Sequence, residues 1–238
     1  MDVSVDAQPS PEEIGSLNTS LEGRNPQEIV QTAVQRFGDT LILACSFGAE
    51  DVVLADMLFK VNPQAVLFYL DTEFLFPETY EVRDRLISHY KLHETQVLQV
   101  KSALSPAEQA AQFGEGLWLR QPDKCCDLRK VEPLTRVLKG YAAWITGIRR
   151  DQSPTRANAG IVEWDAKFQL MKFNPLAQWS WEQVWEYIKM NNVPYNALHD
   201  QHYPSIGCTH CTAPVMPGED PRSGRWKTST KTECGLHR

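Results

Sequence analysis

Short apolar runs alternate with amphipathic segments along most of the chain. The apolar runs that fit strands are Thr40–Cys45, Ala65–Leu70, Thr95–Val100 and Ala142–Thr146. Helical patterns are expected near Pro26–Phe37, Glu50–Lys60, Pro77–Tyr90, Pro106–Phe113 and Ser180–Met190. Strands that alternate with helices are typical of βαβ units. The pattern therefore predicts an α/β fold in which helices flank a mostly parallel sheet.

Both ends of the chain depart from this alternation. Residues 1–25 are rich in Ser, Pro, Glu and Asn, which predicts a disordered or loosely docked N-terminal arm. Residues 26–206 form the expected α/β core. Residues 207–238 contain several prolines and a charged end, so we expect a loop region followed by a flexible C-terminal tail.

Composition limits the kinds of partner. The 238 residues carry a net charge of −6, which gives no general attraction to nucleic acid or to anionic lipid. No run approaches the roughly 18 consecutive apolar residues of a membrane span, and residues 1–25 lack the apolar region of a signal peptide. We therefore expect a cytoplasmic protein that binds neither nucleic acid nor membrane. Six cysteines in such a chain favour metal or redox chemistry over structural disulfides.

Loops that follow the predicted strands are the expected ligand site, because ligands of open α/β sheets bind beyond the carboxyl ends of the strands. The first loop carries Ser46, Phe47, Gly48 and Asp51 at a strand-to-helix turn. Its N–H groups could hold a phosphate at the start of the helix. A tight turn without a ligand, in which Gly48 supplies the conformation, explains the loop equally well.

Two further loops follow the second and fourth predicted strands. Asp71 and Thr72 could hydrogen-bond a ribose or a base, or simply form a local turn. Arg149 and Arg150 are stronger evidence for an anion site, because guanidinium groups pair with phosphate or sulfate oxygens. A solvated arginine pair is the alternative. The tryptophans near the last helix are assigned to the core; they are Trp179, Trp181 and Trp185.

Four cysteines fall into two close pairs, Cys125 with Cys126 and Cys208 with Cys211. Four thiolates are the usual ligand set of a [4Fe–4S] cluster. Zinc is the nearest rival, but structural zinc pairs are typically spaced by two to four residues. The tandem pair fits a cluster better, because each thiolate can bind a different iron. His210 could donate to the centre, replace a ligand, or be an exposed loop histidine.

Cys234 lies in a charged, turn-forming tail, three residues before His237. A thiol used only for packing is normally buried. We therefore interpret Cys234 as a mobile nucleophile, since the thiolate is the reactive form of cysteine.

Assembled, these residues resemble the assimilatory adenylyl-sulfate reductases, close relatives of the phosphoadenylyl-sulfate reductases. The matching stretches cover nearly everything after residue 40, and the paired cysteines together with Glu-Cys-Gly-Leu-His make the combination specific. Glu73 departs from the glycine that the family often has after Leu-Asp-Thr, which bears on the conformation of that loop. The resemblance implies an adenine nucleotide α-hydrolase-like fold with a modified PP-loop that no longer cleaves ATP.

The resemblance also implies a reaction in sulfate assimilation. Cys234 would attack the sulfur of adenylyl sulfate, expel AMP and carry an S-sulfonate, which thioredoxin or glutaredoxin would then release as sulfite. Cys234 and His237 are the implied catalytic residues, and Cys125, Cys126, Cys208 and Cys211 the implied ligands of a [4Fe–4S] cluster. The implied substrate-binding residues are Ser46, Phe47, Gly48, Asp51, Leu70, Asp71, Thr72, Lys130, Gly147, Arg149, Arg222 and Arg225. A homo-oligomer is expected by analogy.

Other functions remain open at this point. The nearest is the same chemistry on 3′-phosphoadenylyl sulfate. A cluster-containing tRNA-thiolating ATP pyrophosphatase would need a fuller glycine-rich loop and a basic RNA surface. A zinc-binding module would explain four cysteines but not Cys234.

Overall fold

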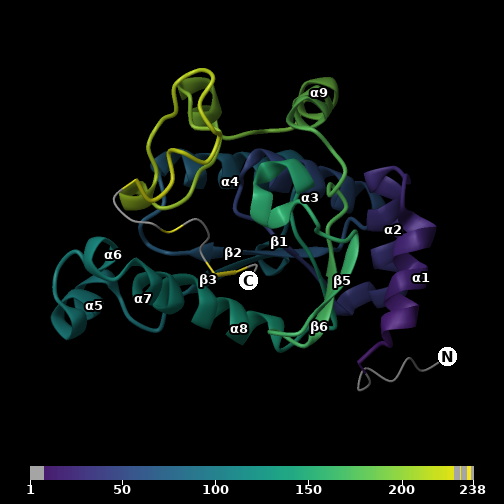
Figure 1. The fold of residues 1–238 in the computed structure, drawn as a ribbon, viewed down its shortest axis with the longest axis horizontal. Helices are drawn as coiled ribbons and strands as arrows, with labels where there is room; N and C mark the ends of the chain where they lie inside the picture. The colour runs from purple at the N-terminus through teal and green to yellow at the C-terminus, as the bar shows by residue number, and fades with distance from the viewer. Residues whose placement is uncertain (1–7, 228–230, 232–234, 237–238) are drawn as a thin grey trace.

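A six-stranded sheet runs through the middle of the protein, in a computed structural model that describes residues 8–227, 231 and 235–236 (Figure 1). The strands, in the order in which they pair, are β3 (Val97–Lys101), β2 (Val66–Asp71), β1 (Leu41–Ala44), β4 (Ala143–Ile145), β6 (Leu170–Phe173) and β5 (Val162–Asp165). Neighbouring strands are parallel, except that β5 and β6 are antiparallel. The predicted fold class is confirmed.

Each face of the sheet carries its own helical layer, because side chains alternate along a strand. Ile42, Phe68 and Trp144 form one apolar cluster with α8 (Glu132–Leu138). The opposite face is covered by α2 (Pro26–Phe37), α3 (Ala49–Val61), α4 (Pro77–Tyr90) and α9 (Trp181–Asn191). Figure 1 shows α3, α4 and α9 on one side of the strands and α8 on the other.

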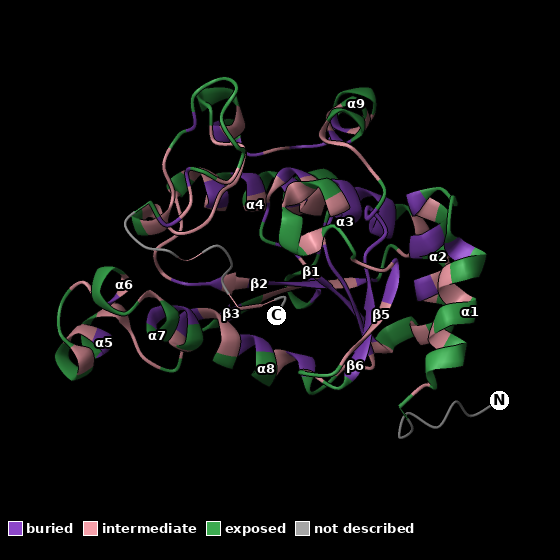
Figure 2. Ribbon diagram, in the orientation of Figure 1, coloured by how far each residue is buried: buried purple, intermediate pink, exposed green. Residues whose placement is uncertain are grey.

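Helix α3 is the most deeply buried helix of the layer formed by α2, α3, α4 and α9. Residues 52–59 are all buried, whereas the outward faces of α1, α5 and α9 are exposed (Figure 2). An apolar helix of this kind is fixed by packing on all sides. Its N-terminus, which follows β1, is therefore held in a fixed position at the carboxyl ends of the strands.

A chain of short helices links β3 to β4. It contains α5 (Pro106–Phe113), α6 (Leu117–Arg120), α7 (Pro122–Cys126) and a π-helical turn at Asp127–Val131 that leads into α8. The sequence pattern predicted α5 but no element from 117 to 138. A π-helical turn inside a helical run is uncommon and is often found at functional sites.

Two parts of the fold were not expected. Helix α1 (Pro11–Leu21) forms within the arm that was expected to be disordered or loosely docked; Ser10 and Glu13 make a capping box at its start. The side chain of Asn18 makes two hydrogen bonds, of 2.6 and 3.0 Å, with the backbone of Val162 in β5. The division of the chain into arm, core and tail stays a prediction.

The hairpin of β5 and β6 was also missed. Each strand has only four residues. Val162–Asp165 alternates apolar and charged residues but Leu170–Phe173 does not, so the pairing of β6 with β4 and with β5 decides their conformation.

The described helices are all too short or too polar to cross a membrane.

Candidate functional site

A cavity of about 420 Å³ lies beyond the carboxyl ends of β1, β2 and β4. It is lined by the three loops that follow these strands, by the start of α8 and by segment 204–226. Nearly all the implied substrate-binding residues meet there: Ser46, Phe47, Gly48, Asp51, Leu70, Thr72, Lys130, Gly147, Arg149, Arg222 and Arg225. Asp71 is not among the lining residues. Cys234 and His237 lie outside the described residues.

The loop between β1 and α3 is organised by Asp51. Its carboxylate accepts hydrogen bonds from the backbone N–H and the hydroxyl of Ser46, both at 2.6 Å. Phe47 takes the left-handed conformation, with φ 61°, whereas Gly48 does not. In the alternative explanation of this loop as a turn without a ligand, Gly48 therefore does not supply a left-handed conformation. A left-handed non-glycine residue carries backbone strain, which is typical of functional loops.

Burial raises the pKa of Asp51 to about 6. The two hydrogen bonds from Ser46 oppose this shift, the nearby negative charge of Glu50 adds to it, and the positive charge of Arg156 opposes it. Asp51 is thus ionised at neutral pH and offers the cavity a strong hydrogen-bond acceptor.

Gly147 brings the loop after β4 against the loop after β1. A β-carbon at this position would overlap Oδ1 of Asp51 and lie 3.0 Å from Cβ of Glu50. Only glycine permits this approach.

Asp71 braces the loop after β2. It is 2% exposed and accepts hydrogen bonds from the Tyr80 hydroxyl at 2.7 Å, the Gln99 amide at 2.5 Å and the backbone N–H of Glu73 at 2.9 Å. These protein groups occupy its carboxylate, so the structure gives it a positioning role. Thr72 does line the cavity, and its hydroxyl lies 3.2 Å from the thiol of Cys208.

Arg149 is also paired within the protein. Its Nε and Nη2 atoms each lie 2.9 Å from Oε1 of Glu50, and its Nη1 pairs with Asp151. The guanidinium, 5% exposed, stacks over the Trp181 ring at 5.4 Å. Arg149 therefore lines the cavity as a neutralised charge. Arg150 does not line it; it bonds to the carbonyl of Ala159 and to Glu22.

The charge of the cavity wall changes from one side to the other. The side made by the loops after β1 and β4, with the start of α9, carries four carboxylates and two guanidinium groups: Glu50, Asp51, Asp151, Glu182, Arg149 and Arg156. The side made by the α7–α8 region and segment 204–226 carries Lys130, Arg222 and Arg225. An elongated ligand with one anionic end and one neutral end would match this distribution.

The four cysteines line a second, smaller cavity that shares Lys130, Arg225 and Trp226 with the first. Cys125 and Cys126 end α7, while Cys208 precedes a short 3₁₀ turn, Thr209–Cys211, that ends at Cys211. Among the described residues, none of the four cysteines forms a disulfide. Burial raises the pKa of Cys125 to about 12 and that of Cys211 to about 11, and the charges of the neighbouring cysteines add to both shifts.

Among the described residues, no group of three or more His, Cys, Asp or Glu side chains forms a site for a single metal ion. Two buried donors nevertheless lack partners in the same part of the chain: Nη2 of Arg129 and Nε of Arg225. Both arginines line the thiol cavity, and Arg129 is 1% exposed. Unpaired cationic N–H groups around four thiols suit an anionic occupant, since buried donors without partners are costly.

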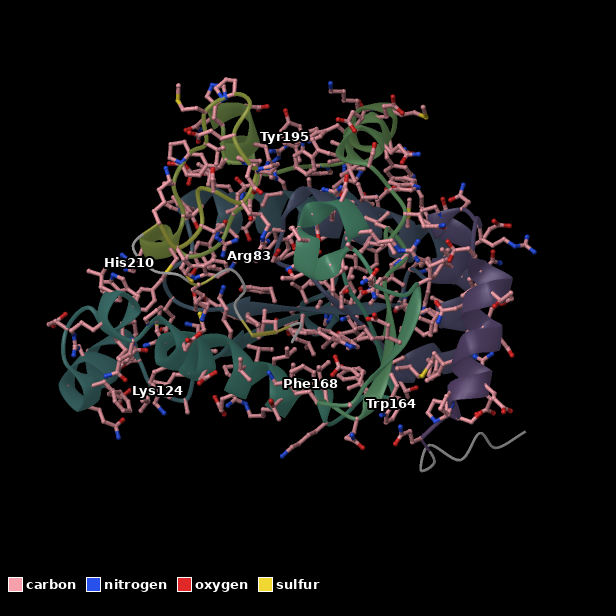
Figure 3. All side chains as sticks on the ribbon, in the orientation of Figure 1. Arg83, Lys124, Trp164, Phe168, Tyr195 and His210 are labelled. Carbon is pink, nitrogen blue, oxygen red and sulfur yellow. The ribbon has the colours of Figure 1, made fainter. Side chains whose placement is uncertain are left out.

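Aromatic rings cover the thiol cavity. His210 stacks on Trp118 from α6, with ring centres 3.8 Å apart and an angle of 7° between the planes. Phe74 packs edge-on against both rings. Figure 3 labels His210 where segment 204–226 approaches the α6–α7 region. His210 is therefore a packing residue here, and burial lowers its pKa. Nothing in the sequence around Trp118 indicated that its ring stacks on His210.

Described residues of the tail contact α7 and the larger cavity. Nζ of Lys231 lies 2.7 Å from Oδ1 of Asp123 in α7. The carbonyl of Gly235 accepts a hydrogen bond of 2.7 Å from Lys167. Leu236 packs on the apolar cluster that Ile42, Phe68 and Trp144 form with α8, and it lines the larger cavity.

Sequence reasoning missed other residues that shape the larger cavity. Gln152 donates to Glu50 and to the carbonyl of Gly147. Trp181 packs on the core, as predicted, but also lines the cavity. His199 bonds through Nδ1 to the carbonyl of Tyr203 at 2.9 Å, and burial lowers its pKa. Gln152 lies in a loop that the sequence indicated, whereas His199 carried no signal.

The sequence matches the family described as "Phosphoadenosine phosphosulfate reductase domain" over residues 40–214. An "Adenosine 5′-phosphosulfate reductase" of Shouchella clausii is 52% identical over 93% of this chain and 91% of the relative. A "Phosphoadenosine 5′-phosphosulfate reductase" of Gloeobacter violaceus is 52% identical over 89% of this chain and 88% of the relative. The crystal structure of a phosphoadenylyl-sulfate reductase from Candida auris, a phosphate complex, aligns with a TM-score of 0.77 and 34% identity, covering 87% of this chain and 99% of that one.

Proposed function

Because the chain belongs to the phosphoadenosine phosphosulfate reductase family, we propose that it reduces adenylyl sulfate to sulfite and AMP in sulfate assimilation. It is an oxidoreductase that acts on a sulfur group. The observation that carries the choice of substrate is the division of charge across the larger cavity.

The basic side suits the phosphosulfate end of the substrate. Lys130, Arg222 and Arg225 gather there, and Arg225 is oriented by Ser205 and by the Trp226 ring 4.5 Å away. Positive charge beside the phosphate favours departure of AMP, because negative charge grows on the leaving oxygen as the sulfur–oxygen bond breaks. The neutral adenosine then extends toward the loops after β1 and β4.

The acidic side favours the plain nucleotide over the 3′-phosphorylated one. Asp51 is a strong acceptor for a ribose hydroxyl, and Glu50, Asp151 and Glu182 line the same side. Arg149 already pairs with Glu50 and Asp151, so its charge is not available to a further phosphate. An added phosphate would meet a wall on which four carboxylates outnumber the guanidinium groups of Arg149 and Arg156, which costs free energy in a partly desolvated cavity. The same chemistry on 3′-phosphoadenylyl sulfate is the alternative.

Cys234 is the proposed nucleophile. Its thiolate attacks the sulfur of adenylyl sulfate, a sulfur–sulfur bond forms, and the sulfur–oxygen bond to phosphate breaks with release of AMP. The first thiolate of a dithiol then attacks the Cys234 sulfur and releases sulfite. The second thiol of the same dithiol resolves the mixed disulfide, so two electrons come from the dithiol. Thioredoxin or glutaredoxin is the proposed dithiol, and His237 is proposed to act beside Cys234.

A [4Fe–4S] cluster is the proposed cofactor, held by Cys125, Cys126, Cys208 and Cys211. A cluster presents a separate iron to each thiolate, so its ligands need not converge on one point. Support comes from the shared cavity of the four thiols and from Arg129 and Arg225, which line it and each have an unpaired buried donor. When bound, the cluster supplies a compact negative charge next to the basic side of the substrate cavity. Cytoplasmic location and a homo-oligomeric state remain expectations.

The test is intact-mass analysis of anaerobically purified protein after incubation with adenylyl sulfate and without thiol. A Cys234→Ser variant is the control. The proposal expects a sulfonate adduct on the natural sequence alone, discharged as sulfite by thioredoxin. Absence of an adduct with adenylyl sulfate and with its 3′-phosphorylated form would overturn the mechanism. An adduct with the 3′-phosphorylated form only would overturn the assignment of substrate.

A further inference from the structure

Lys231 belongs to the tail that carries Cys234, three residues further on, yet its side chain lies against α7. Its ammonium lies 2.7 Å from Oδ1 of Asp123 and 3.4 Å from the carbonyl of Pro122. It lies 5.9 Å from the ring centre of Trp226, and Cys126 is near enough to interact with it. Lys231 is thus the point at which the described part of the tail touches the tandem cysteines.

Burial lowers the pKa of Lys231, and the hydrogen bond with Asp123 and then the nearby Cys126 raise it, so the ion pair with Asp123 is one of two interactions at this ammonium. The Lys231 side chain is 5% exposed, whereas that of Asp123 is 74% exposed. A pair with an exposed partner contributes little, while burial of an ammonium is costly. An anionic neighbour on the buried side offsets that cost, and Cys126 stands there. As a cluster ligand, Cys126 would be a thiolate in contact with a negatively charged group.

Described tail residues on the other side of Cys234 are held as well. Lys167 donates to the carbonyl of Gly235 at 2.7 Å. The side chain of Leu236 packs on the apolar cluster that contains Leu134 and Trp144 and lines the substrate cavity. The described tail residues on either side of Cys234 in the sequence therefore lie at α7, for Lys231, and at the substrate cavity, for Leu236.

We propose that Lys231 is a positioning residue that couples the cysteine centre to the catalytic tail. Its ammonium donates to the sulfur of Cys126 and holds the tail beside α7, so that the negative charge of the cluster favours the arrangement in which Cys234 meets the substrate. Coupling of this kind is reciprocal: the docked tail must also perturb the iron–sulfur bond at Cys126. The inference rests on the proposed function and on the proposed cluster.

The test compares three variants of the cluster-loaded protein. Lys231→Gln removes the charge, Lys231→Arg keeps it, and Lys227→Gln removes an exposed charge four residues earlier in the chain, where the ammonium lies 3.5 Å from the carbonyl of Pro214. One readout is the iron–thiolate stretching bands in resonance Raman spectra. The other is a pair of rates: formation of the S-sulfonate in a single turnover, and its discharge by thioredoxin.

Lys231→Gln should move an iron–thiolate band to higher frequency, because a hydrogen bond to sulfur weakens the bond to iron. It should slow formation of the S-sulfonate about tenfold or more, the effect of losing one charged hydrogen bond, and leave its discharge unchanged. Lys231→Arg should keep the band frequency and the rate of S-sulfonate formation close to those of the natural sequence. Lys227→Gln should match the natural sequence in both. A Lys231→Gln protein that matches Lys227→Gln in bands and rates would overturn the inference.

Other outcomes separate this inference from its premises. Natural protein that forms no S-sulfonate contradicts the proposed function itself. Natural protein that forms the adduct but contains no iron or sulfide contradicts the cluster, and the coupling with it. Slower formation with unchanged Raman bands would also overturn the coupling, because it would assign Lys231 to the tail alone.

Discussion

Gly147 and Asp51 are in such close contact that a β-carbon on the glycine would overlap the carboxylate. The contact joins the loops that follow β1 and β4, which are neighbours in the sheet. Both loops line the proposed nucleotide cavity, so their separation fixes its width.

Gly147→Ala should therefore weaken AMP binding about tenfold or more while the protein remains folded, since Asp51 must give way. Isothermal titration calorimetry with AMP measures the loss. Gly140→Ala is the matched control, because its β-carbon would lie 3.9 Å from the nearest atom, the carbonyl of Val137. Equal affinity in the two variants would show that the contact does not shape the site.

Asp51 should make stability depend on pH. Its pKa is raised from 3.8 to about 6, so between about pH 4 and pH 6 the folded state binds more protons than the unfolded state. The contribution of Asp51 to stability is present below pH 4 and is lost as pH rises through 6. Asp51→Asn keeps acceptors for Ser46 and removes the titration.

The free energy of unfolding of Asp51→Asn, relative to that of the natural sequence, should thus rise by about 2 kcal/mol between pH 4 and pH 7. Urea unfolding at both pH values measures the difference. The exposed Asp39→Asn serves as control. A stability difference that is constant with pH, or that falls as pH rises, would contradict the raised pKa.

Asp56 ties three helices together. It is 2% exposed, accepts hydrogen bonds of 2.6 Å from the hydroxyls of Tyr90 and Tyr187, and pairs with Lys60 at 2.7 Å. Asp56→Asn should lower the free energy of unfolding by about 2–4 kcal/mol, because the two tyrosine donors lose a charged acceptor.

Tyr90→Phe and Tyr187→Phe should each cost about 1.5–3 kcal/mol, the range for hydrogen bonds to charged groups. In urea unfolding, each double variant of a tyrosine change with Asp56→Asn should lose less free energy of unfolding than the two single variants lose together. Strict additivity would mean that the hydroxyls do not bond to Asp56 in solution.

Trp118 should protect the proposed cluster from oxygen. Trp118→Ala removes the ring stacked on His210 and opens the cover of the thiol cavity. We expect the iron content of anaerobic protein to be unchanged, and the visible absorbance to decay faster in air. Trp118→Phe keeps an aromatic ring and should decay at an intermediate rate. Identical decay in all three proteins would assign the ring to packing alone.

The sequence predicted where the ligand loops lie but not how their side chains are used. Strands β1, β2 and β4 were predictable because their apolar runs are buried, and each is followed by a loop of the cavity. Arg149 was assigned to an anion site by its residue type. Its partner Glu50 lies 99 residues away in sequence, and only the fold brings the two together.

Similar reasons explain the other differences. Asp71 ends a predicted strand, yet the hydroxyl of Tyr80 and the amide of Gln99 occupy its carboxylate. The cysteine pairs were visible as a pattern, whereas the ring of Trp118 lies over them only because α6 folds back. Residue types indicate the chemistry that a loop can perform; the contacts decide which residues remain available for it.

The hydrogen bonds between Asn18 and Val162 bear on how copies of this chain can meet. Strand β5 is at the edge of the sheet, and the Asn18 amide occupies both backbone groups of Val162. Free strand edges invite pairing with other chains, and α1 blocks that route. A shortened chain beginning at Pro26 would uncover the edge and should aggregate more readily, while the assembly expected for the full chain must use another surface.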